Sequence, residues 1–158
     1  MGKIFIDTLE LEKEVITLLE REKYLVLATC SGDRVTARSM SHINIGLDVF
    51  FQTDKKFLKV KQINQNPRVA LCISNLQIEG IAEFQEYPSD EENIRFYELY
   101  KQKHPNSFEM YSGIKDEIVL KIQPTLITLW KYVAGKPCRD YLNNHEKIAY
   151  REYYKLED

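Results

Sequence analysis

The chain has 158 residues, of which 44% are hydrophobic and 29% charged, and its formal net charge is -2 at pH 7. This balance predicts one soluble globular domain over residues 1–158, and it excludes the strongly basic field of nucleic-acid-binding proteins. No apolar run is long enough to span a bilayer, and the charged N-terminal segment is not typical of a signal peptide. We therefore expect a cytoplasmic protein.

The hydrophobic pattern predicts short strands separated by a few helices. Leucine and valine recur at helical spacing over residues 8–22, with Asp7 or Thr8 as the N-cap. Further helices are expected at 54–64, which Asn66-Pro67 ends, and after residue 88 up to Pro105. The ranges expected as strands are 24–29, 34–45, 49–53, 68–74, 77–87, 118–122 and 126–132.

Turn residues connect these strands, at Ser31–Asp33 and Gly46–Asp48, and Gly80 is expected to mark a bend. Five strands precede the major helix and two follow it, an order that favours an antiparallel barrel over parallel βαβ units. We predict a mainly β (α+β) fold, a six- to seven-stranded antiparallel β-barrel with peripheral helices and a core over residues 24–132. The polar, tyrosine-rich tail at 138–158 is expected to be helical.

Residues 34–45 alternate between small or apolar side chains at odd positions and polar ones at even positions. A period of two predicts that the odd positions face the core and the even positions face the opposite side. Arg38 lies in the middle of the polar side, where its fork would suit a phosphate. The alternative is a solvated arginine that pairs with a neighbouring glutamate.

The strand predicted at 49–53 leads directly into the helix predicted at 54–64, and a helix N-terminus attracts anions. Lys56 and Lys59 lie on one side of that helix. A phosphate near the helix start would then meet Thr53, a lysine and Arg38. The alternative is a solvated basic face, with Asp54 satisfying the helix start. Scattered cysteines and histidines indicate neither disulfides nor a metal site.

Taken in order, several segments resemble one known family. They are residues 24–29, 35–40, 51–53, 59–69 and 78–82. The series is similar to the pyridoxamine 5'-phosphate oxidase-like family of FMN-binding split barrels, including its small, nitroimidazole-reductase-like bacterial members. The resemblance covers about residues 23–84, with weaker support to residue 132. It implies FMN as the cofactor and a homodimer with the flavin at the subunit interface.

The resemblance also implies individual roles. Arg38 and Lys59 resemble the phosphate ligands, Ser39 to Ser41 the stretch along the flavin ring, and Gln52 with Thr53 the pair that contacts the ring and ribityl chain. Trp130 from the partner chain would close the groove. With Lys56 from the helix argument, the candidate FMN-binding residues are Arg38, Ser39, Met40, Ser41, Gln52, Thr53, Lys56, Lys59 and Trp130.

Two departures argue against pyridoxamine phosphate as a substrate. Leu58 stands where those oxidases carry a polar or basic residue, and residues 128–132 lack their arginine-bearing motif. We expect an oxidoreductase in which FMN passes electrons from a reduced nicotinamide to an unidentified small acceptor, because no nucleophile or acid–base group stands out. The alternatives are a non-catalytic flavin-binding or redox-sensing protein, or a split barrel that binds deazaflavin, or haem through His42.

Overall fold

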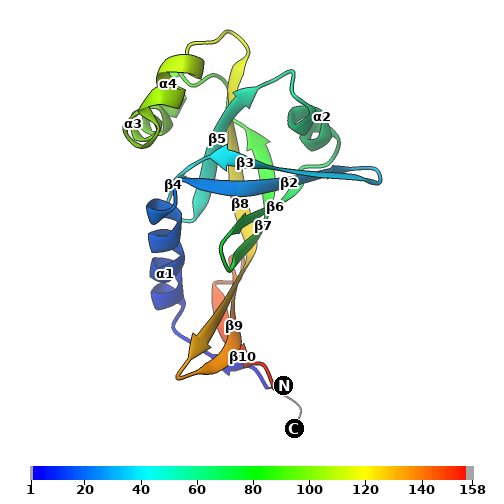
Figure 1. Ribbon diagram of the computed structural model, residues 1–158, viewed down its shortest axis with the longest axis vertical. Coiled ribbons are helices and arrows are strands. Elements are labelled where there is room, and N and C mark those ends of the chain that lie inside the picture. Colours follow the sequence, from blue (N-terminus) through cyan, green and yellow to red (C-terminus); the bar gives the residue numbers. More distant parts are fainter. Residues whose placement is uncertain (1, 156–158) are drawn as a thin grey trace.

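One antiparallel sheet organises the protein, shown in Figure 1 as a computed structural model that describes residues 2–155. Within these residues the helices are α1 (Thr8–Arg21), α2 (Leu58–Gln65), α3 (Ile94–Lys103) and α4 (Pro105–Tyr111), with a 3-10 turn at Glu91–Asn93. The strands are β1 (Ile4–Phe5), β2 (Tyr24–Ser31), β3 (Arg34–Ser41), β4 (Ile43–Ile45), β5 (Asp48–Asp54), β6 (Arg68–Ile73), β7 (Leu76–Phe84), β8 (Glu117–Val133), β9 (Lys136–Asn143) and β10 (Ile148–Tyr153). None of the described helices is long and apolar enough to cross a membrane.

The long strand β8 is the centre of the sheet. One edge of β8 pairs with β7, while the other pairs first with β5 and then, from Leu126 onward, with β9. The sheet continues from β7 through β6 and β2 to β3, and from β9 through β10 to β1. Because β5 and β9 share one edge of β8, the sheet divides into two parts, as expected for a split barrel (Figure 1). We call the part formed by β1, β9, β10 and residues 126–133 of β8 the arm, and the remaining strands the barrel half. The strands outnumber the six or seven predicted, mainly because the arm also contains the N-terminus and the tail.

Pro124 does not separate two strands, as the sequence suggested, because β8 runs through it without a break. Proline lacks an N–H and normally interrupts a ladder. Here it lies between Ile122, where pairing with β5 ends, and Leu126, where pairing with β9 begins. No ladder bond on that edge depends on its nitrogen.

The bend expected at Gly80 is confirmed as a shift of register between Glu79 and Gly80 in β7. A Cβ atom at Gly80 would lie 2.7 Å from Cγ2 of Ile122 and 2.9 Å from the carbonyl oxygen of Gln123. Only glycine fits at this close approach between β7 and β8 without displacing backbone.

The helices largely follow the predicted pattern, but two start late: α2, and α3, which follows the 3-10 turn at Glu91–Asn93 and begins at Ile94. Asp7 caps α1 by accepting from the Glu10 N–H at 3.0 Å. The helix predicted from residue 54 begins only at Leu58, because Asp54 accepts from the Lys56 N–H in a turn. The helix α4 is not predicted by the sequence pattern; it begins at Pro105, where a helix-starting proline loses no internal hydrogen bond.

The tail is not helical, so that prediction is wrong: residues 136–143 and 148–153 form β9 and β10. Their side chains alternate with a period of two, so Cys138, Asp140 and Leu142 are buried while Tyr141 lies on the other side and stacks on Tyr150, with ring centroids 4.9 Å apart. Tyrosine favours strands because it packs on a half-buried pleated surface. Residues 156–158 of the predicted tail lie outside the described part of the chain.

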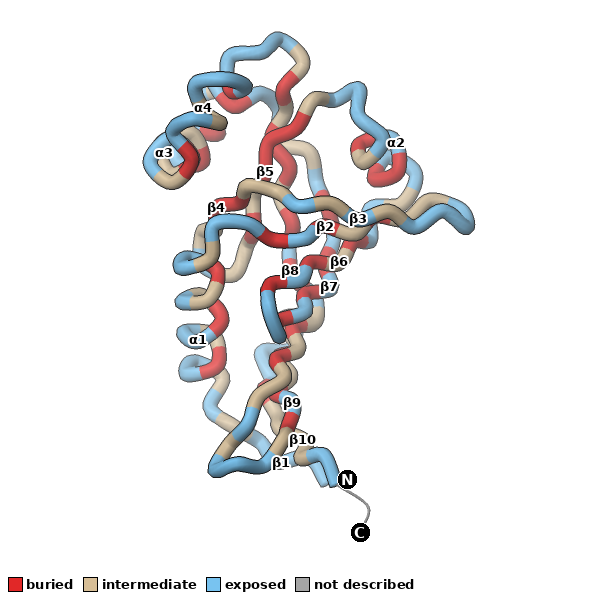
Figure 2. The backbone as a smooth tube through the Cα atoms, viewed as in Figure 1, coloured by how far each residue is buried: buried red, intermediate tan, exposed pale blue. Residues whose placement is uncertain are grey.

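The core lies between α1 and the sheet, where buried residues line the inner side of α1 and the middle of the strands (Figure 2). A buried ion network fastens α1 to the arm. Asp140, only 1% exposed, accepts from Arg151 at 2.6 and 2.9 Å and pairs with Lys131 at 2.9 Å. Lys131 also binds Glu14 of α1 at 2.7 Å.

The two faces of β3 are the reverse of the prediction. The even positions Thr36, Arg38 and Met40 are half-buried, whereas the odd positions Val35 and Ala37 are exposed, Val35 to 69%. The predicted strand also breaks at His42, whose ring is completely buried. The outer side of β3 therefore exposes small and apolar side chains.

Candidate functional site

Arg38 is held by hydrogen bonds that leave part of its fork free. Its Nη1 donates to the Leu27 carbonyl oxygen at 3.2 Å and to the Thr29 hydroxyl at 2.8 Å, and its Nη2 donates to the Thr36 hydroxyl. Of the five N–H donors of a guanidinium, the Nε–H and one Nη2–H have no partner among the described residues. No described carboxylate forms an ion pair with Arg38, so the paired-arginine alternative does not apply within residues 2–155.

Lys59 adds a second cation near Arg38. Its Nζ donates to the Thr53 hydroxyl at 3.0 Å. Burial lowers the pKa of Lys59, and the positive charge of Arg38 lowers it further, against weaker opposing effects from Glu117 and Asp54. These two neighbouring cations repel each other, and neither forms an ion pair with a carboxylate among the described residues. A bound anion would therefore stabilise them. The structure thus brings Arg38, Thr53 and Lys59 together.

Lys56 does not join this group. Its ammonium pairs with Asp116 at 3.3 Å and with Asp54 at 3.9 Å, and its side chain is exposed. The late start of α2 places Lys56 in the preceding turn, so it and Lys59 do not share a helix face.

A pocket of about 370 Å³, a size within the range of small-ligand sites, is lined by Lys59 but not by Arg38, which lies near Lys59 outside the lining. Its lining comes from β3, β5, the start of α2, the helices α3 and α4, and the residues that lead into β8. In Figure 1, α2 lies on one side of the end of β5 and the pair α3–α4 lies on the other. Six predicted residues line it: Ser39, Met40, Ser41, Gln52, Thr53 and Lys59. The lining that the sequence analysis did not predict comprises Asp54, Phe57, Tyr100, Ser107, Tyr111, Ile114 and Glu117.

Glu117 is the main functional group that sequence reasoning missed. It is 5% exposed, and its carboxyl accepts from Nε2 of Gln52 at 3.3 Å, while Oε1 of Gln52 accepts from Ser112 at 2.8 Å. Burial, with the negative charge of Asp54, raises the pKa of Glu117 to about 7, although Lys59 opposes the shift. The pocket therefore contains an acid–base group that titrates near neutrality. The residue gave no signal in the sequence, where it only precedes a strand.

We expect Glu117→Gln to change how stability depends on pH. Because the folded-state pKa is raised, the native fold loses stability as pH rises from the ordinary value of 4.5 to about 7, when the buried carboxyl must ionise. The variant should match the native protein near pH 5 and exceed it at pH 8 by on the order of 2 kcal/mol. Urea denaturation at both pH values measures the difference. A constant difference across this range would contradict the assigned titration.

Two predicted residues lie elsewhere. Trp130 is in the arm, where its ring packs edge-on against Tyr132 and Tyr154. The guanidinium of Arg139 lies over the same ring, 4.8 Å from its centroid. It does not line the pocket of its own chain, so its contribution from a partner chain stays a prediction. His42 points inward, with Nε2 2.8 Å from the Leu19 carbonyl oxygen, and is not on an open ligand face.

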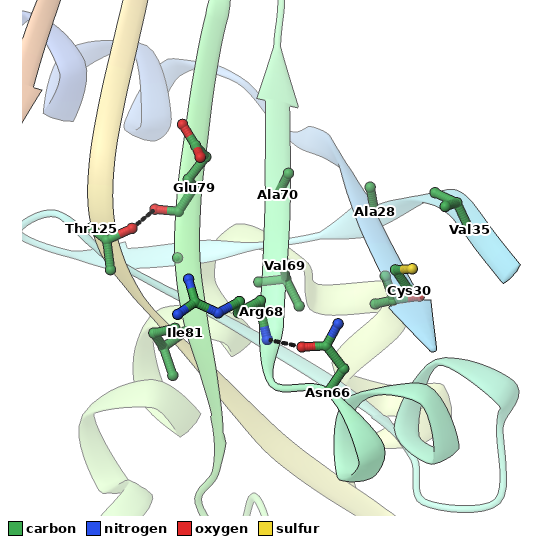
Figure 3. Close-up of a pocket in the computed structure, with 12 residues that line it drawn as sticks. Ala28, Cys30, Val35, Asn66, Arg68, Val69, Ala70, Glu79, Ile81 and Thr125 are labelled. Carbon is green, nitrogen blue, oxygen red and sulfur yellow. Dashed lines mark hydrogen bonds between the residues drawn. The ribbon is translucent and has the colours of Figure 1, made fainter. Parts of the chain in front are cut away.

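A second pocket, of about 320 Å³, lies on the outward face of the sheet, between β2, β3, β6 and β7 (Figure 3). Its floor is made of small or apolar side chains that include Ala28, Val35 and Ala70, and one side carries Arg68. None of the predicted FMN-binding residues lines it. Its open floor of small residues belongs to the exposed sheet face, whereas Lys59, Glu117 and several hydroxyl groups line the pocket beside β5.

Together, one β8 edge shared between β5 and β9 and a pocket beside the end of β5 define a split β-barrel. The chain belongs to the pyridoxamine 5'-phosphate oxidase family, whose model matches residues 11–131. No curated protein matches the chain.

Solved structures agree with this fold. A putative pyridoxamine 5'-phosphate oxidase from Listeria innocua is 26% identical, with a TM-score of 0.60 over 75% of this chain and 97% of that chain. A pyridoxamine 5'-phosphate oxidase-related, FMN-binding protein from Nostoc punctiforme is 14% identical, with a TM-score of 0.57 over 94% and 93%. The heme storage protein HutZ from Vibrio cholerae is 16% identical, with a TM-score of 0.61 over 72% and 89%.

Proposed function

We propose that the pocket beside β5 binds FMN, with the phosphate held by Arg38, Lys59 and Thr53. The observation that carries this proposal is the pair of neighbouring cations without an ion-pair partner among the described residues, one of which keeps two N–H donors free. Membership of the pyridoxamine 5'-phosphate oxidase family supports the same ligand. Charge-assisted bonds from arginine and lysine are the strong contacts of phosphate sites.

The residues present fit a flavin. The free donors of Arg38 suit a phosphate, the backbone of Ser39 to Ser41 offers polar groups along one wall, and Tyr111 and Phe57 offer aromatic surface at the rim. Bound FMN would supply the electron transfer, and we propose that it passes electrons from a reduced nicotinamide to a small acceptor. Glu117 would hold or release a proton in the same pocket. The supply of reduced nicotinamide favours a cytoplasmic location.

The visible spectrum of the purified protein tests the cofactor. We expect a yellow protein that releases FMN on denaturation and that reduced nicotinamide bleaches without oxygen. A colourless protein that fails to take up added FMN would refute the proposal. A flavin spectrum that reduced nicotinamide leaves intact would favour a non-catalytic flavin-binding protein. Likeness to HutZ makes haem the second candidate, which a Soret-type band would reveal, with an axial ligand other than the buried His42.

Arg38→Ala should weaken binding of FMN far more than binding of riboflavin, which lacks the phosphate. Loss of a charge-assisted contact costs roughly 1.5–3 kcal/mol, so we expect FMN affinity to fall by about one to two orders of magnitude. Fluorescence titration of both flavins measures the ratio. Lys56→Ala is the matched control and should leave both affinities unchanged, because Lys56 pairs with Asp116. Equal losses for FMN and riboflavin would remove Arg38 from the phosphate site.

We further propose that the chain is a homodimer joined through the outward face of β2, β3 and β6. This face carries Val26, Val35 and the row Ala37, Ala28 and Ala70, which are cross-strand neighbours. Such small side chains permit close approach of a second sheet face. A symmetric pair would apply the same patch twice, and it would provide the partner chain from which Trp130 reaches the groove.

A further inference from the structure

The guanidinium of Arg38 donates to the hydroxyls of Thr29 and Thr36, and both hydroxyls also contact a buried glutamine. Thr29 and Thr36 both lie close to Oε1 of Gln62 in α2, at 2.6 and 2.7 Å. Arginine only donates hydrogen bonds, and a hydroxyl has a single proton. The two hydroxyls also lie 3.3 Å from each other, but their contacts to Gln62 are much shorter, so we infer that each accepts from Arg38 and donates to Gln62.

The orientation of Gln62 is fixed as well. Its Nε2 donates to the Arg34 carbonyl oxygen at 3.1 Å, and the residue is only 3% exposed. A flipped amide would set its carbonyl against the Arg34 carbonyl and its NH₂ against two hydroxyls, and one buried contact would lose its partner. Every bond from Arg38 through the two threonines to the Arg34 carbonyl thus has one direction.

This chain of bonds decides which donors of Arg38 remain for a ligand. Nη1 donates both of its N–H groups, to the Leu27 carbonyl oxygen and the Thr29 hydroxyl, and Nη2 donates one to the Thr36 hydroxyl. Because the Thr29 and Thr36 hydroxyls lie only 3.3 Å apart, they meet Nη1 and Nη2 along one edge of the guanidinium. The Nε–H and the second Nη2–H are therefore left side by side on another edge. Such an edge matches two oxygens of a terminal phosphate. A flavin without phosphate offers only a neutral hydroxyl at that position, a single and weaker acceptor.

We propose that Gln62 is a positioning residue that sets selectivity for a terminal phosphate, through Thr29, Thr36 and Arg38. The inference rests on the proposed FMN site but concerns a residue that does not line the pocket. Without Gln62 the two hydroxyls are free to rotate, so the fork of Arg38 is no longer fixed in one orientation. Affinity for the phosphate then falls, while contacts to the flavin ring persist.

Gln62→Met tests the inference, because methionine keeps the length of the side chain but removes its acceptor and donor. We expect FMN affinity to fall about tenfold and riboflavin affinity to stay within about twofold. Gln65→Met is the matched control, since Gln65 lies on the same helix and contacts Ser31 but not Arg38. The ratio of the two affinities is the readout, because a general loss of structure would lower both.

A double variant separates positioning from packing. If Gln62 acts through Arg38, then Gln62→Met should change FMN affinity no further in an Arg38→Ala background. An additional loss there, or an unchanged FMN-to-riboflavin ratio in Gln62→Met alone, would overturn the inference. Should Gln62→Met fail to fold, Thr36→Val breaks the same chain at the half-buried hydroxyl and should show the same selective loss. Failure of the native protein to bind FMN would instead refute the proposed function and the inference together.

Discussion

Asp140→Asn should lower the free energy of unfolding by about 3–5 kcal/mol, the cost of breaking a buried ion pair from one side. The carboxylate of Asp140 is almost fully buried and meets two cations, Arg151 and Lys131. The amide keeps the shape but removes the charge, so both cations stay partly buried without their counter-ion. Since Lys131 also binds Glu14, the loss should extend to the packing of α1 on the arm. Urea denaturation at pH 7 measures the effect.

The pH dependence gives an independent check on Asp140. Burial acts to raise its pKa, but hydrogen bonds from Arg151 and Lys131 lower it overall, below the ordinary value of 3.8. A lowered folded-state pKa contributes stability above pH 3.8 that is lost as pH falls through the folded value. Native and variant stabilities should therefore converge in strong acid. Asp33→Asn, in an exposed turn, is the control and should change stability by less than about 0.5 kcal/mol. An equally small effect for Asp140→Asn would show that the network contributes little.

Ala37→Glu should convert the proposed dimer into monomers and abolish tight FMN binding. Ala37 begins the row of alanines at the centre of the outward face. In a symmetric dimer the substitution buries two unpaired carboxylates, each at a cost of several kcal/mol. We expect the dissociation constant of the dimer to rise by at least about a thousandfold. Light scattering at micromolar concentration gives the mass, and fluorescence titration gives FMN affinity.

The folded monomer should tolerate Ala37→Glu, because Ala37 is exposed in a single chain. Its circular dichroism and unfolding free energy should therefore change little, which separates loss of assembly from loss of fold. Ser89→Glu adds the same charge on an exposed loop and should leave the mass unchanged. A monomer mass for the native protein, or a dimer mass for Ala37→Glu, would refute this interface.

Several features of the candidate site could be predicted from local sequence. The ordered segments around Arg38, Thr53 and Lys59 indicated the family and the fold class, because their spacing preserves a strand, a turn and a helix that meet. Gly80 was recognised as a bend because glycine interrupts a strand pattern. A helix that started at residue 54 would put Lys56 and Lys59 on one side, but the turn at Asp54 delays the start of α2, and that turn depends on a single side-chain bond.

Other parts of the site depend on contacts between distant segments. Glu117 lies 64 residues after Thr53 in the sequence. The pairing of β5 with β8 nevertheless places Glu117 directly opposite Asp54, the neighbour of Thr53. Gln62 reaches Thr29 and Thr36 only because α2 packs over β2 and β3. The helices α3 and α4 complete the pocket wall, and no local pattern shows which surface they cover.

The family, the antiparallel strands, the two cations proposed to hold the phosphate and six of the thirteen pocket-lining residues can be predicted from the sequence alone, because they follow from period, turn chemistry and ordered motifs. Contacts between distant segments set which side of β3 is buried, the strand structure of the tail, the near-neutral pKa of Glu117 and the hydrogen bonds of Arg38. Alternation shows that two faces differ but not which one the rest of the chain covers. Burial, charge state and hydrogen-bond direction are set by neighbours that only folding brings together.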